Sequence, residues 1–260
     1  MKIMKKLLAV ALMLVLVLGV MAGCSSGNDE KTNDDGTQQK ETLVMATNAQ
    51  FPPYEYYDGD KIVGIDAEVA ALIAEKLGME LEIADIEFDS IVPGVQQGKY
   101  DMGMAGMTVN DERLEQVNFT TSYAKGVQVV IVKEDSDIKT IDDLTGKKIG
   151  AQQGTTGAIY AAEDYGEENV TTYASGNLAV EGLKTGKVDC VIIDNEPAKA
   201  YVSENEGLKI LETEYANEDY AIAIAKDNTE LMEKVNSALE ELIENGELQK
   251  IVDKYITSEE

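Results

Sequence analysis

The sequence of 260 residues contains no histidine, only two cysteines and a single arginine. Histidine is the commonest general base and metal ligand in proteins, so its absence removes the usual basis for either role. Cys24 and Cys190 are too few to form a disulfide framework. Cys190 follows Asp189 in an apolar run, which predicts a buried and inert thiol. We therefore expect no catalytic residue, no metal site and no cofactor.

Positive charge is also scarce. The chain has 22 lysine and arginine residues against 49 aspartate and glutamate residues, a net charge of −27. Such an excess of negative charge argues against binding to nucleic acid or to an anionic membrane surface. It keeps a protein soluble, and we expect a monomer, but it does not fix the sign of charge that a single pocket prefers.

No apolar run is long enough for an ordinary membrane span. The longest, Leu7–Val20, has 14 residues, whereas a span needs about 20. Lysines precede this run, and Ala22–Cys24 resembles a bacterial lipobox, although Met21 stands where leucine is usual. We predict that residues 1–23 are a lipoprotein signal peptide and that Cys24 is lipidated, which anchors the protein to the outer face of the bacterial cell membrane or leaves it periplasmic. The alternative is an uncleaved anchor helix with the same topology.

Residues 24–41 follow as a predicted disordered tether, because 25–40 contain no apolar side chain. Strand and helix patterns then alternate, which predicts an α/β fold with parallel sheets. The expected strands are 43–47, 81–86, 100–105, 127–132, 148–151, 188–193 and 220–225. The expected helices include 66–77, 89–97, 140–143, 177–185, 228–245 and a last one to about 256. Asp66 is the predicted cap of the first, and 140–143 has a capping-box spacing. Two more helices are expected, one starting near Asp111 after the cap Asn110 and one opened by Pro197.

An internal repeat indicates two units of similar plan. Residues 95–101 (VQQGKYD) match 183–189 (LKTGKVD), each reading as a helix end, a glycine stop and a strand start with aspartate. We predict that residues 42–125 together with 222–260 form one lobe and that residues 126–221 form the other. Ligands of open α/β sheets bind at the carboxyl ends of the strands, so two such units facing each other predict a cleft.

Arg113, the single arginine, is the most informative residue for function. Its planar guanidinium can hold a carboxylate through two parallel hydrogen bonds, which the lysine ammonium cannot. Gly106, Thr108 and Asn110 precede it in a polar, turn-prone segment at a strand end. This segment predicts a carboxylate receptor. The alternative is a surface ion pair with Glu112 or Glu115.

Other strand ends add partners for a zwitterion. Thr155 and Thr156 precede a helix and offer amides to an anion. Asp194 follows a buried run and suits an ammonium, with a helix N-cap as the alternative role. Phe51 and Phe88 lie beside loops and are placed either to flank a ligand side chain or to fill the core. The predicted ligand-binding residues are Asn48, Phe51, Phe88, Gly106, Thr108, Arg113, Gln152, Thr155, Thr156 and Asp194.

From about residue 43 to 256 the chain resembles the solute-binding proteins of polar amino-acid ABC transporters, known as bacterial extracellular solute-binding protein family 3. The strongest match is the segment 105–120 (AGMTVNDERLEQVNFT). Further matches are 51–55 (FPPYE) with 63–66 (VGID), 153–156 (QGTT) and 189–194 (DCVIID). The resemblance implies a two-lobed, type II periplasmic-binding-protein fold in which two strands join the lobes and hinge closure encloses the ligand.

The same resemblance implies roles for individual residues. Arg113, Thr108 and Thr156 would take the ligand's α-carboxylate. Asp194, the Gly106 carbonyl and the Thr108 hydroxyl would take its α-amino group, while Phe51 and Phe88 would flank the side chain. It further implies capture of a free L-amino acid, delivery to an ABC permease with its ATPase, and no enzymatic activity.

Departures from the family pattern leave the ligand's side chain open. Many relatives that bind glutamine or basic amino acids have aspartate in place of Asn48, and glutamine binders tend to have lysine at Gln152 and histidine at Ile193. Asp194–Asn195 and Gln128 resemble arginine binders. We expect a basic amino acid such as arginine or lysine, or a polar neutral one such as glutamine or cystine. Two other functions use the same fold: a ligand-presenting sensor for a membrane receptor and a dehydratase-like enzyme.

Overall fold

The computed structural model describes residues 41–256. The predicted signal peptide 1–23, Cys24 and the predicted tether up to residue 40 lie outside the described residues. Within 41–256, no helix combines the length and the hydropathy that crossing a membrane requires.

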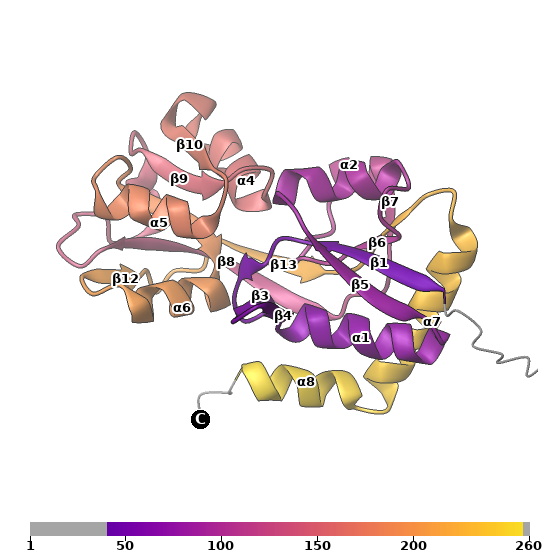
Figure 1. Ribbon diagram of the computed structural model, residues 1–260. Helices are drawn as coiled ribbons and strands as arrows, with labels where there is room; N and C mark the ends of the chain where they lie inside the picture. The colour runs from indigo at the N-terminus through magenta and orange to yellow at the C-terminus, as the bar shows by residue number, and fades with distance from the viewer. Residues whose placement is uncertain (1–40, 257–260) are drawn as a thin grey trace, which may run out of the picture. The chain divides into compact units, whose positions relative to one another are not determined.

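The described chain folds into two α/β lobes, each built on its own sheet, which confirms the predicted two-lobed fold class (Figure 1). The first sheet has the order β5 (Glu80–Asp85), β1 (Thr42–Thr47), β6 (Met102–Gly103), β14 (Ala223–Ala225) and β7 (Val117–Phe119). The second has the order β10 (Val170–Tyr173), β9 (Ile149–Gln152), β11 (Cys190–Asp194), β8 (Ala124–Lys133) and β12 (Leu208–Ile210), with β13 (Ala216–Tyr220) also paired to β8. A small third sheet contains β2 (Gln50–Phe51), β3 (Glu55–Asp58) and β4 (Lys61–Val63).

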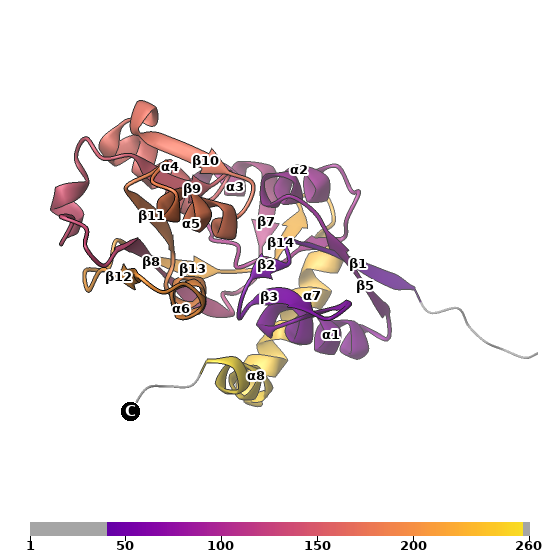
Figure 2. The same ribbon diagram turned by 60° about the vertical axis from the view of Figure 1, so that its left-hand side comes forward.

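Helices cover both faces of each large sheet (Figures 1 and 2). In the first lobe, α1 (Ile65–Leu77), α7 (Thr229–Glu244) and α8 (Glu247–Tyr255) pack together, while α2 (Ile91–Gln96) and α3 (Asp111–Gln116) lie on the opposite face. In the second lobe, α4 (Thr156–Tyr165) covers one face and α5 (Gly176–Lys184) and α6 (Asn195–Glu204) cover the other. Short 3-10 turns occupy Phe88–Ser90, Ile141–Leu144 and Glu167–Asn169.

Strand alternation explains why each sheet has a core on both faces. Successive side chains of a strand point to opposite sides. In β1, Leu43 and Met45 belong to the core beneath α1 and α7, whereas Ala46 belongs to the core beneath α2. The alternating residues of β8 are likewise divided between the two cores of the second lobe. Cys190 is a free, buried thiol in one of these cores, and burial raises its pKa to about 12, as an inert core cysteine requires.

The internal repeat corresponds to a shared structural device. Gly98 and Gly186 both adopt a left-handed conformation, with φ of 69° and 73°. The aspartate that follows each glycine then fixes the neighbouring strand. The Asp101 carboxylate accepts a hydrogen bond from the Val44 backbone N–H at 2.7 Å, and the Asp189 carboxylate accepts one from the Lys148 N–H at 2.8 Å. The same helix–glycine–strand step is therefore used once in each lobe.

Two antiparallel strands carry the chain between the lobes. β8 pairs with β13 in a register that joins Gln128 to Ala216 and Ala124 to Tyr220. The Tyr123 N–H continues this pairing by donating to the Tyr220 carbonyl at 2.9 Å. The chain then enters the first sheet as β14, so both connections run side by side (Figure 1).

Several predicted elements differ from the structure. Asp66 does not cap α1, because Gly64, with a φ of 122°, occupies the N-cap position. The predicted strand 100–105 pairs regularly only at β6, since the chain turns away beyond Met104 to form the polar segment at Gly106. The predicted strand 220–225 is divided into β13 and β14, because residues between them pass from one sheet to the other.

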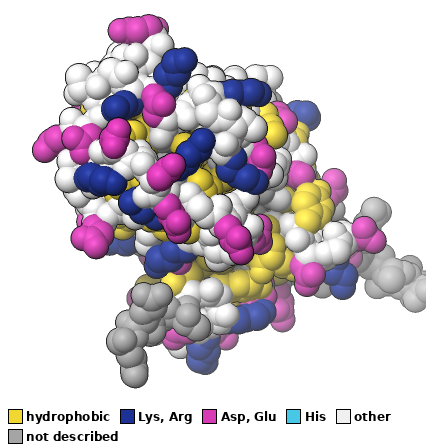
Figure 3. All heavy atoms as spheres, turned by 90° about the vertical axis from the view of Figure 1, so that its left-hand side faces the viewer, with side chains coloured by type: hydrophobic (Ala, Val, Ile, Leu, Met, Phe, Trp, Pro, Cys, Tyr) yellow, Lys and Arg dark blue, Asp and Glu magenta, His cyan; other side chains and the backbone are white. Residues whose placement is uncertain are grey.

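The surface of the second lobe in Figure 3 carries lysine side chains interspersed with aspartate and glutamate. No field of one sign covers this view, although the whole chain has a net charge of −27. Charge on this face therefore does not single out a binding surface. Charged side chains also line the pocket between the two lobes.

Candidate functional site

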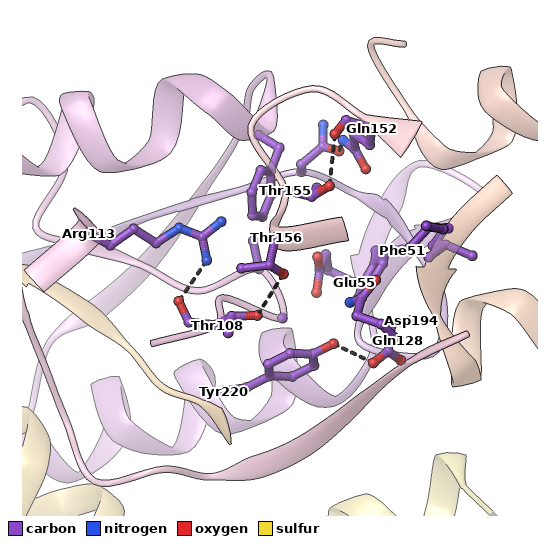
Figure 4. Close-up of a pocket in the computed structure, with 16 residues that line it drawn as sticks. Phe51, Glu55, Thr108, Arg113, Gln128, Gln152, Thr155, Thr156, Asp194 and Tyr220 are labelled. Atoms are coloured by element: carbon purple, nitrogen blue, oxygen red, sulfur yellow. Dashed lines mark hydrogen bonds between the residues drawn. The ribbon is translucent and has the colours of Figure 1, made fainter. Parts of the chain in front are cut away.

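A pocket lies between the lobes, at the carboxyl ends of strands from both large sheets (Figure 4). β1 is followed there by Asn48, while β9 ends at Gln152 and β11 ends at Asp194. This is the edge at which open α/β sheets bind ligands. The structure brings all ten predicted site residues to this pocket. Its lining consists of Asn48, Phe51, Glu55, Phe88, Ala105, Gly106, Thr108, Arg113, Gln128, Gln152, Thr155, Thr156, Ile192, Ile193, Asp194 and Tyr220.

Arg113 is held in the pocket by the short helix that carries it. The Asn110 side chain caps α3 by accepting a hydrogen bond from the Arg113 backbone N–H at 2.8 Å, as predicted. The Arg113 side chain is buried, so the alternative of a solvated surface ion pair is wrong. Its guanidinium donates to the carbonyls of Thr108 at 2.6 Å and Gly154 at 3.0 Å, and it lies 5.3 Å from the centre of the Phe88 ring.

The charge on Arg113 survives this burial. Burial lowers the pKa of the guanidinium, and nearby negative groups, Glu218 foremost, oppose that change. Arginine starts from so high a pKa that it stays protonated in proteins. A guanidinium has several N–H donors, and the two carbonyl contacts leave others available. The fork is therefore positioned and still able to bind an anion.

Two threonine groups face each other beside Arg113. The hydroxyl oxygens of Thr108 and Thr156 lie 3.5 Å apart, across the interface of the lobes. The Thr108 hydroxyl also donates to a Glu218 carboxylate oxygen at 3.0 Å. Thr155 caps α4, and its hydroxyl donates to the Gln152 carbonyl at 2.8 Å. The N-terminus of α4 thus adds a favourable electrostatic environment for a negative charge.

Asp194 supplies the opposite charge. It is almost fully buried, and it caps α6 by accepting from the Glu196 N–H at 3.1 Å. Its other oxygen accepts from the Val127 N–H at 2.9 Å and from the Tyr220 hydroxyl at 2.6 Å. Burial raises the pKa of the carboxyl to about 7, and these hydrogen bonds oppose the rise. The predicted N-cap role is therefore confirmed, although α6 begins at Asn195 rather than at Pro197.

The aromatic residues both line the pocket and pack into the cores. Phe51 stacks on Tyr54 with ring centres 5.8 Å apart. Gly106 lies against the Phe51 ring, and a Cβ atom built there would approach it to 2.8 Å. The φ of Gly106 is 50°, so both space and backbone conformation favour glycine. The ligand-flanking and core-filling interpretations of Phe51 and Phe88 are thus compatible.

Three further hydrogen bonds join the lobes around the pocket. The Gln152 amide donates to the Asn48 side-chain oxygen at 2.9 Å. The Tyr201 hydroxyl donates to the Gln50 carbonyl at 2.5 Å, and the Gln153 amide donates to the Asp89 carboxylate at 2.5 Å. These contacts show that the two walls of the pocket meet in this conformation.

Six lining residues are not among the ten predicted: Glu55, Ala105, Gln128, Ile192, Ile193 and Tyr220. Glu55 lies in a hairpin of polar and aromatic residues, a pattern typical of exposed strands, yet it is 1 % exposed. Tyr220 comes from the end of β13, and the sequence around it does not indicate that it lines a pocket. Within residues 41–256, no cluster of histidine, cysteine, aspartate and glutamate is arranged to hold a metal ion.

Comparisons with known proteins find a matching family and similar structures. The family model described as bacterial extracellular solute-binding proteins, family 3, matches residues 43–258. The arginine-binding extracellular protein ArtP of Bacillus subtilis is 34% identical over 254 residues, covering 95% of this chain and 98% of that protein. The structure of an ancestral arginine-binding protein bound to arginine has a TM-score of 0.78 at 41% identity, covering 84% of this chain and 99% of that one. The arginine-, lysine-, histidine-binding protein ArtJ of Geobacillus stearothermophilus has a TM-score of 0.80 at 34% identity, covering 85% and 97%.

Proposed function

Because the chain belongs to the bacterial extracellular solute-binding proteins of family 3, we propose that it captures a free L-amino acid outside the cytoplasm and delivers it to an ABC importer. The observation that carries this proposal is the opposition of Arg113 and Asp194 in one pocket, each buried and each in a different lobe. A free amino acid carries one carboxylate and one ammonium, which these two groups match in charge and number.

In the proposed complex, Arg113, Thr108 and Thr156 receive the α-carboxylate, and the Arg113 guanidinium supplies the positive charge. Asp194 receives the α-ammonium, together with the Gly106 carbonyl and the Thr108 hydroxyl. Asn48, Gln152 and Thr155 complete the walls, while Phe51 and Phe88 flank the side chain. All of these residues line the same pocket in the structure.

Capture proceeds by closure of the lobes. The ligand first meets one lobe, for which the Arg113 lobe is the natural candidate, and the other then closes on it about β8 and β13. Only the closed form makes both charge contacts, so the ligand stabilises that form. The proposed partner is a permease with its ATPase, which reopens the lobes. The lobe boundaries predicted from sequence, 42–125 with 222–260 and 126–221, are part of this proposal.

The ligand class remains the one that the sequence predicts: a basic amino acid such as arginine or lysine, or a polar neutral one such as glutamine or cystine. Arginine is the first ligand to test, since ArtP and the ancestral structure are named for binding it. We propose a binding role without catalysis. The described residues contain neither histidine nor a metal-binding cluster, and the relatives named above are binding proteins.

Lipid anchoring through Cys24, with the protein as a monomer at the outer face of the cell membrane, is a separate part of the proposal and rests on the sequence before residue 25. Expression of the full chain with Cys24→Ser tests it. The wild-type protein should incorporate a labelled fatty acid and the variant should not, whichever fraction each enters, because an uncleaved leader would also hold the variant in the membrane. Equal labelling of the two proteins would exclude an anchor on this thiol.

A thermal-shift panel of the twenty L-amino acids on residues 24–260 tests amino-acid binding. Ligand at about 1,000 times Kd stabilises a folded protein by about 4 kcal/mol, which raises the unfolding midpoint by several degrees. The proposal expects such a shift with one or a few basic or polar amino acids. No shift with any of them would contradict it and would favour a sensor or an enzyme for another ligand.

A further inference from the structure

The charged residues that line the pocket are not balanced by a simple zwitterion. They are Arg113, Asp194 and Glu55. In the proposed function, on which this inference rests, Arg113 is matched by the ligand's carboxylate and Asp194 by its ammonium. Glu55 is then left without a counter-charge. It is 1 % exposed, and in Figure 4 its carboxyl group points toward the middle of the pocket.

Glu55 also lacks hydrogen-bond donors. Both of its carboxylate oxygens are buried without a partner, and so is one oxygen of Asp66. The other Asp66 oxygen accepts from the Gly106 N–H and from the Tyr123 hydroxyl, each at 2.9 Å. A buried carboxylate without a donor is costly. Glu55 and Asp66 are within hydrogen-bonding reach of each other, and one proton shared between them would supply the missing donor.

The surroundings of Glu55 favour holding that proton in the absence of a ligand. The groups that act on it are Asp66 of α1, Asp85 of β5, Asp194 of β11 and the hydroxyls of Tyr54, Tyr123 and Tyr201. These are acids and neutral phenols. Burial first, and then the negative charge of Asp66, raise the pKa of Glu55 well above its usual value. Burial also raises the pKa of Asp66 to about 6.

We propose that Glu55 and Asp66 form a proton-sharing pair that selects a cationic ligand side chain, and that the pair releases its proton when that cation enters the pocket. A positive charge near Glu55 favours the ionised carboxylate. The cation then provides the counter-charge that the proton supplied before, so one positive charge replaces another. A ligand with a neutral side chain leaves the proton in place. Selection for arginine or lysine over neutral amino acids should therefore strengthen as pH rises.

L-Arginine and L-citrulline separate this effect from the rest of the site. Both carry the same zwitterion, and citrulline replaces the guanidinium by a neutral urea group of similar shape. Asp194 can also release a proton when it receives the α-ammonium, and it does so for both ligands. Calorimetry in buffers of different ionisation enthalpy counts the protons released. We expect arginine to release up to about one proton more than citrulline near pH 6.

Two variants test whether the extra proton released with arginine comes from Glu55 and Asp66. Glu55→Gln should weaken arginine binding by roughly ten- to a hundredfold, the range for loss of a charged hydrogen bond, and should change citrulline binding far less. It should also abolish the extra proton. Asp66→Asn keeps the Glu55 carboxylate, so arginine should still bind while the extra proton is reduced. Glu82→Gln, the same exchange at an exposed site on β5, is the matched control and should change nothing.

The outcomes separate this inference from the proposed function. Equal proton release for arginine and citrulline in the wild-type protein would overturn the pair, and this result needs no variant to fold. Equal losses of both ligands in a folded Glu55→Gln protein would reduce Glu55 to a packing role. Binding of neutral amino acids with no binding of arginine or lysine would overturn selection for cations but leave the proposed function intact. Binding of no amino acid would refute the proposed function itself.

Discussion

The Gln152 side-chain amide donates a 2.9 Å hydrogen bond to the Asn48 side-chain oxygen, and this bond links residues that follow β1 in one lobe and end β9 in the other. Asn48 is itself oriented by donating to the Ile86 carbonyl at 2.8 Å. Polar contacts made by side chains thus join the lobes here, and they open at little cost once water can replace them. Such a contact suits a cleft that must open again.

Cross-lobe hydrogen bonds outside the pocket should tune affinity without changing selectivity. Tyr201→Phe removes the bond to Gln50 and leaves the pocket lining intact. Since a hydrogen bond contributes about 0.5–1.5 kcal/mol, and this one exists only in the closed form, ligand affinity should fall about two- to tenfold. The affinity ratio of any two ligands should stay constant. Calorimetry measures both quantities.

Tyr57→Phe is the matched control, because the Tyr57 hydroxyl bonds to Asp85 at 3.1 Å within the first lobe. It should leave affinity unchanged. An equal loss of affinity in both variants would mean that closure is not what Tyr201 stabilises.

Arg113→Lys should lower affinity by about a hundredfold even though it keeps the positive charge. Lysine cannot span the Thr108 and Gly154 carbonyls and also present a fork to a carboxylate. Lys125→Arg makes the reverse exchange at a highly exposed residue and is the control. Titration calorimetry measures the ligand affinity of both variants. If Arg113→Lys binds as tightly as the wild-type protein, Arg113 does not hold the ligand.

Asp194→Asn should abolish selection for a free α-amino group. The variant keeps the size of the side chain but loses the charge that faces the ammonium, so affinity for the free amino acid should fall at least about tenfold. Affinity for its N-acetyl derivative should change little. Asp60→Asn, which changes the net charge equally at an exposed residue outside the pocket lining, is the control. A preference for the free amino group that survives Asp194→Asn would contradict this role.

Stability of the ligand-free protein should decrease as pH rises from about 4 to 7. The pKa of Asp194 is about 7 in the folded state, against an ordinary value of 3.8, so the folded chain holds a proton that the unfolded chain has already lost. The stability due to that proton is fully present below the ordinary pKa and is lost as pH rises through about 7. For Asp194 alone this amounts to at most about 4 kcal/mol.

Urea unfolding at several pH values measures this slope. Asp194→Asn should flatten this dependence of stability on pH. The variant also loses hydrogen bonds, but that loss of stability is the same at every pH, so it does not change the slope. Lowered carboxyl pKa values, such as those of Asp143 and Asp219, act in the opposite direction but below about pH 4. An unchanged slope in the variant would mean that Asp194 is ionised in the free protein at low pH.

Local patterns predicted the two-lobed fold correctly, and they selected ten residues that the structure brings to one pocket, because both depend on short segments. Asn110 caps α3 and delivers Arg113, and the repeat around Gly98 and Gly186 recurs in the structure. Asp194 follows a run of buried residues, and its capping role could be predicted from the chain that follows it. In each case the informative residues lie within a few positions of one another.

Contacts between distant segments could not be predicted in this way. Asp66 has the composition of an N-cap, but its carboxylate bonds instead to Gly106 and Tyr123, 40 and 57 residues away. Glu55 is buried only because the other lobe and α1 enclose its hairpin. Tyr220 reaches Asp194 from the return strand β13. All three lie next to charged groups of the pocket, and the sequence around them does not show that they meet there.

The most direct test of the central claim compares wild-type binding of a free L-amino acid with that of its two blocked forms, using L-arginine, N-acetyl-L-arginine and L-arginine methyl ester in calorimetry. Opposed Arg113 and Asp194 predict tight binding of the free amino acid and losses of about a hundredfold or more for each blocked form, since each leaves one buried charge unmatched. If either blocked form binds as tightly as free arginine, the pocket does not grip a zwitterion between its two lobes. If none of the three binds, the comparison is repeated with the amino acid that raises the unfolding midpoint most and with its two blocked forms.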